Sequence, residues 1–120
     1  MRQIMRPLSR YLTVVPLLIL LSGCQKKFSD TRIEIAEEKD DRYGSRAVTV
    51  FAPKDSSVEE FKQWSKDIKQ YEASDKPVDV GFFPIETHSS YYTDIIAQYV
   101  QKRNWLWVKG KNSIAGVPVD

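Results

Sequence analysis

His88 is the only histidine in this sequence of 120 residues, and histidine is the side chain best suited to proton transfer near neutral pH. To act as a general base, it would need a carboxylate that orients its ring and a nucleophile within hydrogen-bond reach. Glu86 and Ser89 are close to it in sequence, but residues so near one another seldom adopt that geometry. We therefore expect His88 to be an exposed histidine that precedes a helix.

The sequence also lacks the motifs that mark other common sites. It has no HExxH, EF-hand or histidine-rich spacing for a metal, and no GxGxxG or Walker pattern for a nucleotide. The GxSxG motif of a hydrolase nucleophile is missing as well. We accordingly expect no metal, no cofactor and no enzymatic activity.

Three polar segments, each following a predicted strand, could still form a rim that binds a ligand. In a parallel sheet the carboxyl ends of the strands meet at one edge, and ligands commonly bind there. Loops are polar in most proteins, so the polarity of these segments does not by itself indicate a site. A small enzyme or ligand-binding domain at this rim around His88 is therefore the alternative function and not the first. The candidate rim residues are Lys54, Asp55, Glu86, His88, Lys109 and Lys111.

The residues before Cys24, the only cysteine, have the order of a secretory signal peptide. Arg2, Arg6 and Arg10 give a positive start, and residues 11–21 are apolar. An apolar stretch of 11 residues is short for a membrane-spanning helix, which needs about 20. A short transmembrane anchor with its arginines in the cytoplasm is the alternative.

The end of this segment, Leu21-Ser22-Gly23-Cys24, resembles the lipobox of bacterial lipoproteins. The resemblance implies that residues 1–23 are a signal peptide and that Cys24 becomes an acylated mature N-terminus, carrying palmitate or similar chains. Several acyl chains make a lasting membrane anchor, whereas a single chain binds only marginally. Gln25, not aspartate, follows the cysteine, so the resemblance points to the periplasmic face of the outer membrane rather than to the inner membrane.

Removal of residues 1–23 changes the charge of the chain. The mature chain of 97 residues has 15 basic and 16 acidic side chains, so the excess of basic residues belongs to the targeting segment. Without a clustered basic face, nucleic-acid binding has no support. The mature chain keeps 13 aromatic residues, enough to build the core of one domain. With its only cysteine assigned to lipid, that domain must be stabilised by packing rather than by a disulfide.

The mature chain reads as β-α-β-α-β with a C-terminal hairpin. Strands are predicted over residues 47–51, 78–83 and 105–108, and a last short strand over 114–117. One helix begins after Ser57, and a second begins at Ser89 or Ser90, with an apolar stripe of Tyr92, Ile95, Ile96, Tyr99 and Val100. We expect an α/β or two-layer α+β domain in which two helices back a small sheet. Alternating elements favour parallel strands, and a ferredoxin-like antiparallel arrangement is the alternative.

The mixed charges between the lipobox and the first predicted strand divide the chain. We assign residues 24–46 to a lipidated N-terminus and polar tether, and residues 47–120 to the domain. The alternation of Ile33 and Ile35 would also fit a short edge strand.

The aromatic residues of the last strand suggest an interface. Trp105 and Trp107 project from one face of that strand, and Tyr91 lies off the stripe of the second predicted helix. We expect both tryptophans to lie under the helices. If that face is uncovered, they become anchors of the kind enriched in interfaces. The function that we expect is a non-enzymatic, lipid-anchored accessory or interaction module for a protein partner in the cell envelope.

Overall fold

The computed structural model of this chain describes residue 28, residues 30–111 and residues 116–120. The predicted signal peptide and lipobox therefore lie outside the described residues, as do residues 112–115 of the predicted hairpin. Among the helices that are described, none has both the length and the apolar character needed to cross a bilayer.

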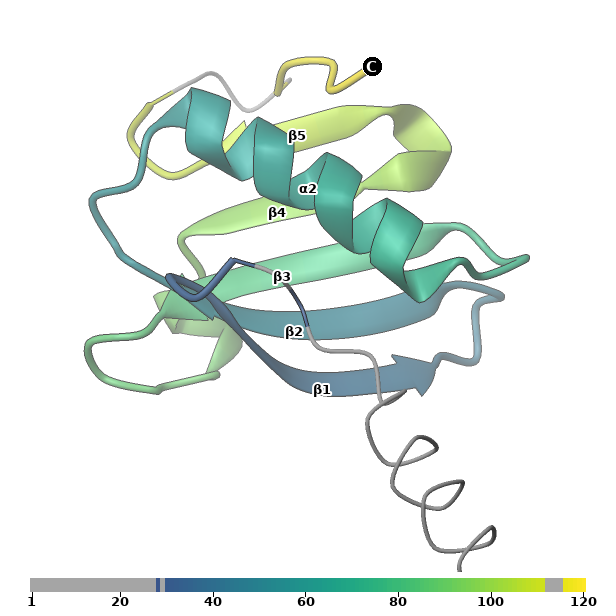
Figure 1. Cartoon of the computed structure of the whole chain (residues 1–120), viewed down its shortest axis with the longest axis horizontal. Coiled ribbons are helices and arrows are strands. Elements are labelled where there is room, and N and C mark those ends of the chain that lie inside the picture. Colours follow the sequence, from purple (N-terminus) through teal and green to yellow (C-terminus); the bar gives the residue numbers. More distant parts are fainter. Residues whose placement is uncertain (1–27, 29, 112–115) are drawn as a thin grey trace, which may run out of the picture.

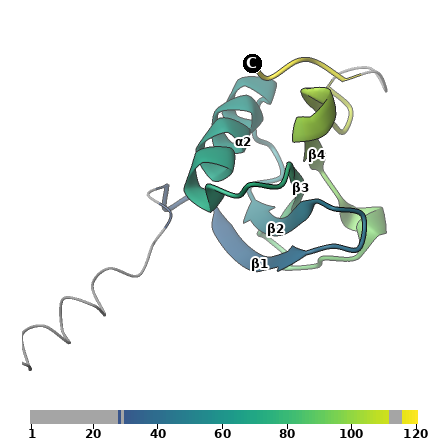
Figure 2. The same cartoon turned by 90° about the vertical axis from the view of Figure 1, so that its right-hand side faces the viewer.

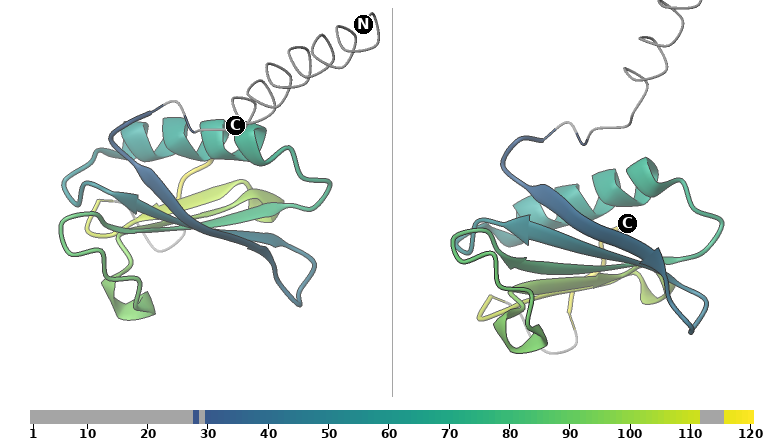
Figure 3. Two further views of the ribbon diagram at one scale, coloured as in Figure 1. Left: turned by 60° about the horizontal axis from the view of Figure 1, so that its bottom comes forward. Right: turned by 90° about the horizontal axis from the view of Figure 1, so that it is seen from below.

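Five strands form one mixed sheet whose spatial order follows the sequence (Figure 1). Only the pair β2–β3 is parallel, and the other three neighbouring pairs are antiparallel. The helix α2, Val58–Glu72, connects the parallel pair and lies on one face of the sheet (Figure 3). The architecture is therefore a small α+β fold. The strands are β1 Glu34–Asp40, β2 Arg46–Ala52, β3 Val78–Pro84, β4 Ala97–Val100 and β5 Trp105–Val108.

The helix α2 is capped at both ends. The Ser57 hydroxyl accepts a hydrogen bond from the Glu60 backbone N–H at 3.1 Å, and the Glu60 carboxylate accepts one from the Ser57 N–H at 2.9 Å. This reciprocal pair is the predicted capping box. At the other end, Ala73 adopts a left-handed conformation with a φ of 46°, which closes the helix.

The core lies between α2 and the sheet. Phe61, Trp64 and Ile68 of α2 are at most 1% exposed, and the ring of Phe61 meets that of Phe82 on β3 at a centroid distance of 5.0 Å. Full burial of each such side chain contributes roughly 1.5–3 kcal/mol. The sheet contributes the remaining large, fully buried side chains: Val50, Val78, Val80, Phe82, Tyr99, Leu106 and Val108.

The predicted second helix is wrong. The stretch forms a single 3-10 turn, η1 Tyr92–Asp94, then the strand β4 and a second 3-10 turn, η2 Gln101–Arg103. Ala97 and Tyr99 are fully buried, while Gln98 and Val100 between and after them are half-buried. Apolar residues at this spacing satisfy a helical stripe and a strand equally well, and pairing with the free edge of β3 decides in favour of the strand. In the described part of the chain, α2 is the only α-helix.

The sheet also starts earlier than expected. The strand β1 lies within residues 24–46, which the sequence analysis assigns to the tether, and it pairs with β2 along its length. The edge-strand alternative is thus the arrangement found. Five of its seven residues are charged, so its sequence lacks the apolar pattern from which a strand is predicted. Such a sequence can still form an edge strand, because an edge strand with solvated faces tolerates charges that a central strand does not. At the other edge, Leu106 on β5 and Val117 form an antiparallel bridge.

The strand directions give the sheet two distinct ends. At the rim end, on the left in Figure 1, β2, β3 and β5 finish and β1 and β4 begin. At the turn end, on the right, lie the β1–β2 turn at residues 41–45, the C-terminus of α2, and η2. The loop at residues 53–57 brings the chain from β2 into α2 at the rim end.

Candidate functional site

A pocket of about 350 Å³ lies at the rim end. Three of the predicted rim residues, Lys54, Glu86 and Lys109, line it together, because β2, β3 and β5 all finish at that end. Both carboxylate oxygens of Glu86 accept hydrogen bonds from the Lys54 backbone N–H at 3.2 Å, which fixes the carboxylate against the loop after β2. The other lining residues are Pro84, Thr87, Ser89, Asp94 and Ile96.

His88 does not line this pocket, although its neighbours Thr87 and Ser89 do. Its φ of 51° reverses the chain locally, and its Nε2 lies 3.0 Å from a carboxylate oxygen of Glu34 at the start of β1. The ring also packs against Phe51 with a centroid distance of 4.7 Å. Asp55 and Lys111 are likewise not among the lining residues. The predicted rim therefore divides, and only Lys54, Glu86 and Lys109 belong to the pocket.

The chemistry of the pocket suits binding more than catalysis. Its two ammonium groups are balanced by the carboxylates of Glu86 and Asp94. The Ser89 hydroxyl donates a hydrogen bond to Asp94, and His88, which lies against Glu34 outside the pocket, forms no hydrogen bond with Ser89 in the described part of the chain. Within the described ranges, no three His, Cys, Asp or Glu side chains come together as a metal-binding group.

The second candidate surface is the face of the sheet opposite α2, which we call the open sheet face. Leu106 and Val108 of β5 belong to the core under α2, so the alternating residues Trp105 and Trp107 lie on the open sheet face. Both tryptophans are half-buried. The expectation that they lie under helices is wrong, because the sheet has α2 on one face only, as Figure 3 shows.

The centre of the open sheet face is polar. Gln98 is the register partner of Trp107 on one side and of Gly81 on the other. Its amide donates a hydrogen bond to the Asp79 carboxylate at 3.3 Å. Partial burial raises the pKa of the Asp79 carboxyl above its ordinary value. In the part of the chain that the structure describes, no Lys or Arg lies within ion-pair distance of Asp79.

The segment that carries Tyr91 lies on the same side of the sheet as the tryptophans. Residues 85–95, which include η1, project from the sheet on the side away from α2 (Figure 2). On this segment Tyr91 is 78% exposed and Tyr92 is 84% exposed. Tyrosine is enriched in protein interfaces, where its ring is buried and its hydroxyl finds a polar partner.

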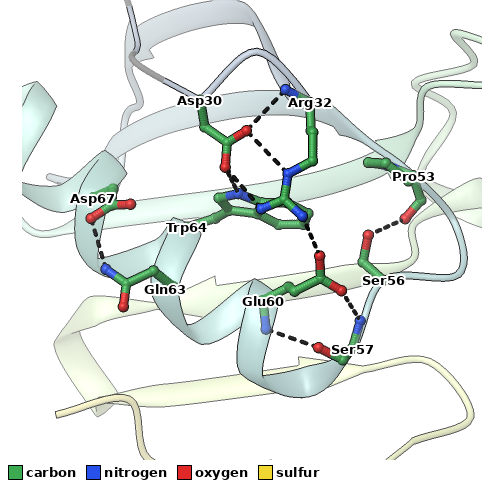
Figure 4. A network of polar contacts seen from close by, with 9 residues as sticks. All are labelled: Asp30, Arg32, Pro53, Ser56, Ser57, Glu60, Gln63, Trp64 and Asp67. Carbon is green, nitrogen blue, oxygen red and sulfur yellow. Dashed lines mark hydrogen bonds and ion pairs between the residues drawn. The ribbon is translucent and has the colours of Figure 1, made fainter.

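Phe28, Asp30 and Arg32 form a polar and aromatic seam along α2 that the sequence analysis missed, and Figure 4 shows its polar part around Asp30 and Arg32. The Trp64 indole donates a hydrogen bond to Asp30 at 2.6 Å, and the Arg32 guanidinium lies over the Trp64 ring at 5.1 Å. Hydrogen bonds from Arg32 and Trp64 lower the pKa of the Asp30 carboxyl to about 2. Arg32 also pairs with Glu60 at 2.7 Å. The one sequence signal for this seam is Phe28, an isolated aromatic residue in a polar stretch.

Comparison with protein-family models, with curated proteins and with solved structures finds no match to this chain.

Proposed function

We propose that this chain is a lipid-anchored lipoprotein of the cell envelope whose domain is a non-enzymatic interaction module for a protein partner. The observation that carries the proposal is the pair Trp105 and Trp107 on the open sheet face. The resemblance of Leu21-Ser22-Gly23-Cys24 to a lipobox supports the anchor and the location at the periplasmic face of the outer membrane.

The mixture of side chains on the open sheet face favours a protein as the partner. Interfaces between separately folded proteins combine tryptophan and tyrosine anchors with polar surroundings. Trp107 is flanked by Gln98, which in turn holds Asp79, so an aromatic side chain and a partly buried carboxylate lie close together. A partner that brings a lysine or arginine to Asp79 would supply the cation that this carboxylate lacks within the described residues.

The anchor is tested by labelling cells with palmitate. The proposal predicts that label enters the wild-type chain and is lost when Cys24→Ala removes the acceptor. Label that persists in the Cys24→Ala chain would contradict it.

The interaction surface is tested by placing a photocrosslinking amino acid at Trp107 in cells. As a matched control, the same amino acid replaces Lys66, an exposed residue of α2 on the opposite side of the domain. The proposal predicts a discrete adduct with one envelope protein from position 107 and none from position 66. Equal adducts from both positions, or none from position 107, would contradict it.

A second candidate function is the binding of a small polar ligand in the rim pocket, favoured by the convergence of Lys54, Glu86 and Lys109. The balanced charges of the lining favour a ligand that carries both signs, such as an amino acid. Ligand-detected NMR with a mixture of free amino acids tests this function. Binding should be lost with Lys109→Ala and kept with Lys66→Ala, and an absence of binding to the wild-type domain would remove this candidate.

A further inference from the structure

The distance between the proposed lipid anchor and the folded domain is short. Only three residues, 25–27, separate Cys24 from Phe28, and Phe28 already packs against α2, with its ring 5.7 Å from that of Tyr71. A chain advances at most 3.3–3.6 Å per residue, so Cys24 lies within about 14 Å of Phe28. A lipidated Cys24 would therefore keep the domain at the membrane surface, without the long tether expected from the sequence.

The position of Phe28 also determines which part of the domain is nearest to the anchor. Tyr71 is in the last turn of α2, and the next residue, Glu72, accepts a hydrogen bond from Arg46 at 2.8 Å. Arg46 is the first residue of β2 and the register partner of Asp40, the last residue of β1. The Phe28 ring thus lies beside the last turn of α2, which is the end of the helix that lies toward the turn end of the sheet, whereas the helix begins at the rim end.

The turn end carries the side chains that a lipid surface attracts. Tyr43 in the β1–β2 turn is 77% exposed, and the Arg42 guanidinium lies 5.2 Å from its ring centroid. Lys102 and Arg103 are exposed in η2. Tyrosine side chains favour the interface between headgroups and water, and basic side chains are attracted to anionic headgroups.

Four carboxylates lie at the same end, and two of them, Asp40 and Glu72, have cationic partners, whereas Asp41 and the exposed Asp75 form no ion pair with any described residue. Asp40 pairs with Lys76 at 3.2 Å, and Glu72 pairs with Arg46. Asp41 accepts hydrogen bonds from two backbone N–H groups of its own turn. By contrast, Arg42, Lys102 and Arg103 form no ion pair with any described carboxylate.

We propose that the domain docks on an anionic lipid surface through its turn end, with Tyr43 at the level of the headgroups. The strands then point away from the membrane, so that the open sheet face and the rim pocket remain accessible to other molecules. This inference rests on the proposed lipidation of Cys24 and adds the orientation of the domain.

The lipidated full chain, reconstituted in vesicles of phosphatidylethanolamine and phosphatidylglycerol, provides the test. Because Cys24 is acylated, a second cysteine can be spin-labelled selectively, at Tyr43→Cys or, as the matched control, at Tyr91→Cys. Both positions are exposed, so neither label disturbs the core. Collision rates with oxygen, which concentrates in lipid, and with a water-soluble nickel complex report the depth of each label.

We expect the ratio of oxygen to nickel collisions to be several-fold higher at position 43 than at position 91. Insertion of about 12 glycine and serine residues between Lys27 and Phe28 gives the chain a longer reach, and it should lower the ratio at position 43 to that at position 91. Equal ratios in the uninserted chain would overturn the docking, and a high ratio that survives the insertion would overturn the role of the short connection.

Flotation of the same vesicles separates this inference from the proposed lipid anchor. A chain that floats with the vesicles but has a water-exposed label at position 43 is anchored without being docked. A chain that fails to float refutes the anchor, and the docking with it.

Discussion

The indole nitrogen of Trp64 lies 2.6 Å from the Asp30 carboxylate, and this contact joins the segment before β1 to the middle of α2. Because Trp64 is 1% exposed, the segment is held by a core residue and not by the surface alone. The same seam brings Phe28 to the end of α2, and so determines how closely the domain follows Cys24.

Asp30 should make the stability of the domain depend on acid pH. Its pKa is about 2 in the folded chain against an ordinary 3.8, so its stabilising contribution is complete above pH 5 and is lost as the pH falls toward 2. Because the pair with Arg32 is partly exposed, we expect about 1 kcal/mol rather than the full linkage value.

Urea unfolding of wild type and Asp30→Asn at pH 7 and pH 2.5 measures this contribution. The variant should be less stable than wild type at pH 7 and should approach it at pH 2.5. The control is Asp67→Asn, which alters a carboxylate on α2 that does not contact Asp30. It should change the free energy of unfolding by less than about 0.5 kcal/mol. A difference between wild type and Asp30→Asn that stays constant with pH would contradict the assignment.

Loss of the capping box should weaken α2. Ser57→Ala removes the acceptor for the Glu60 N–H, and we expect the free energy of unfolding to fall by about 1 kcal/mol. Ser90→Ala, an exposed position outside any helix, should change it by less than about 0.5 kcal/mol. Thermal unfolding followed by circular dichroism measures both variants, and equal losses would show that the cap contributes nothing specific.

The contact between Gly116 and Trp105 should be sensitive to a single methyl group. Gly116 and Gly110 both have a positive φ, of 73° and 72°, but a Cβ at Gly116 would overlap the Trp105 indole, whereas a Cβ at Gly110 meets open space. Gly110→Ala should therefore cost about 1 kcal/mol for backbone strain alone. Gly116→Ala should cost a further 1–3 kcal/mol or so for overpacking, as measured by urea unfolding. Equal costs would mean that Trp105 moves aside freely.

Asp79 should have opposite effects on stability and on binding. Its raised pKa means that the ionised carboxylate is less favourable in the folded chain than in the unfolded chain, and this cost is fully present once the pH exceeds the raised value. Asp79→Asn should thus raise the free energy of unfolding at pH 7, by about 0.5 kcal/mol. The same variant should reduce the yield of photocrosslinked adduct from position 107. A less stable variant with undiminished crosslinking would contradict both expectations.

The parts of the fold that could be predicted from sequence are those in which local and global preferences agree. Around α2, the capping residue Ser57 and the apolar stripe indicate the same helix, and β2, β3 and β5 are short apolar runs with clear ends. Residues 92–100 carry no such agreement, because their apolar spacing suits a helix as well as a strand. There the hydrogen-bonding edge of β3, which is distant in sequence, determines the outcome.

The candidate sites could be predicted only where the strands on which they depend could be predicted. The meeting of Lys54, Glu86 and Lys109 was predictable, because the strand pattern indicates where β2, β3 and β5 end. His88 lies against Glu34 and Phe51 instead, and its backbone has a positive φ that the sequence gives no means of predicting for histidine. The uncovered position of Trp105 and Trp107 depends on the absence of a helix from one face of the sheet, and so it could not be predicted while residues 92–100 were assigned to a helix.

We propose that the lipid-anchored domain binds a protein through its open sheet face. The most direct measurement is chemical crosslinking in cells, followed by affinity purification of the lipidated wild type and of the Trp107→Ala and Lys66→Ala variants. We predict one envelope protein at near-stoichiometric yield with wild type and Lys66→Ala, and at much lower yield with Trp107→Ala in a chain whose circular dichroism is unchanged. Recovery of the wild-type lipoprotein alone, or of the same protein with all three chains, would contradict the account.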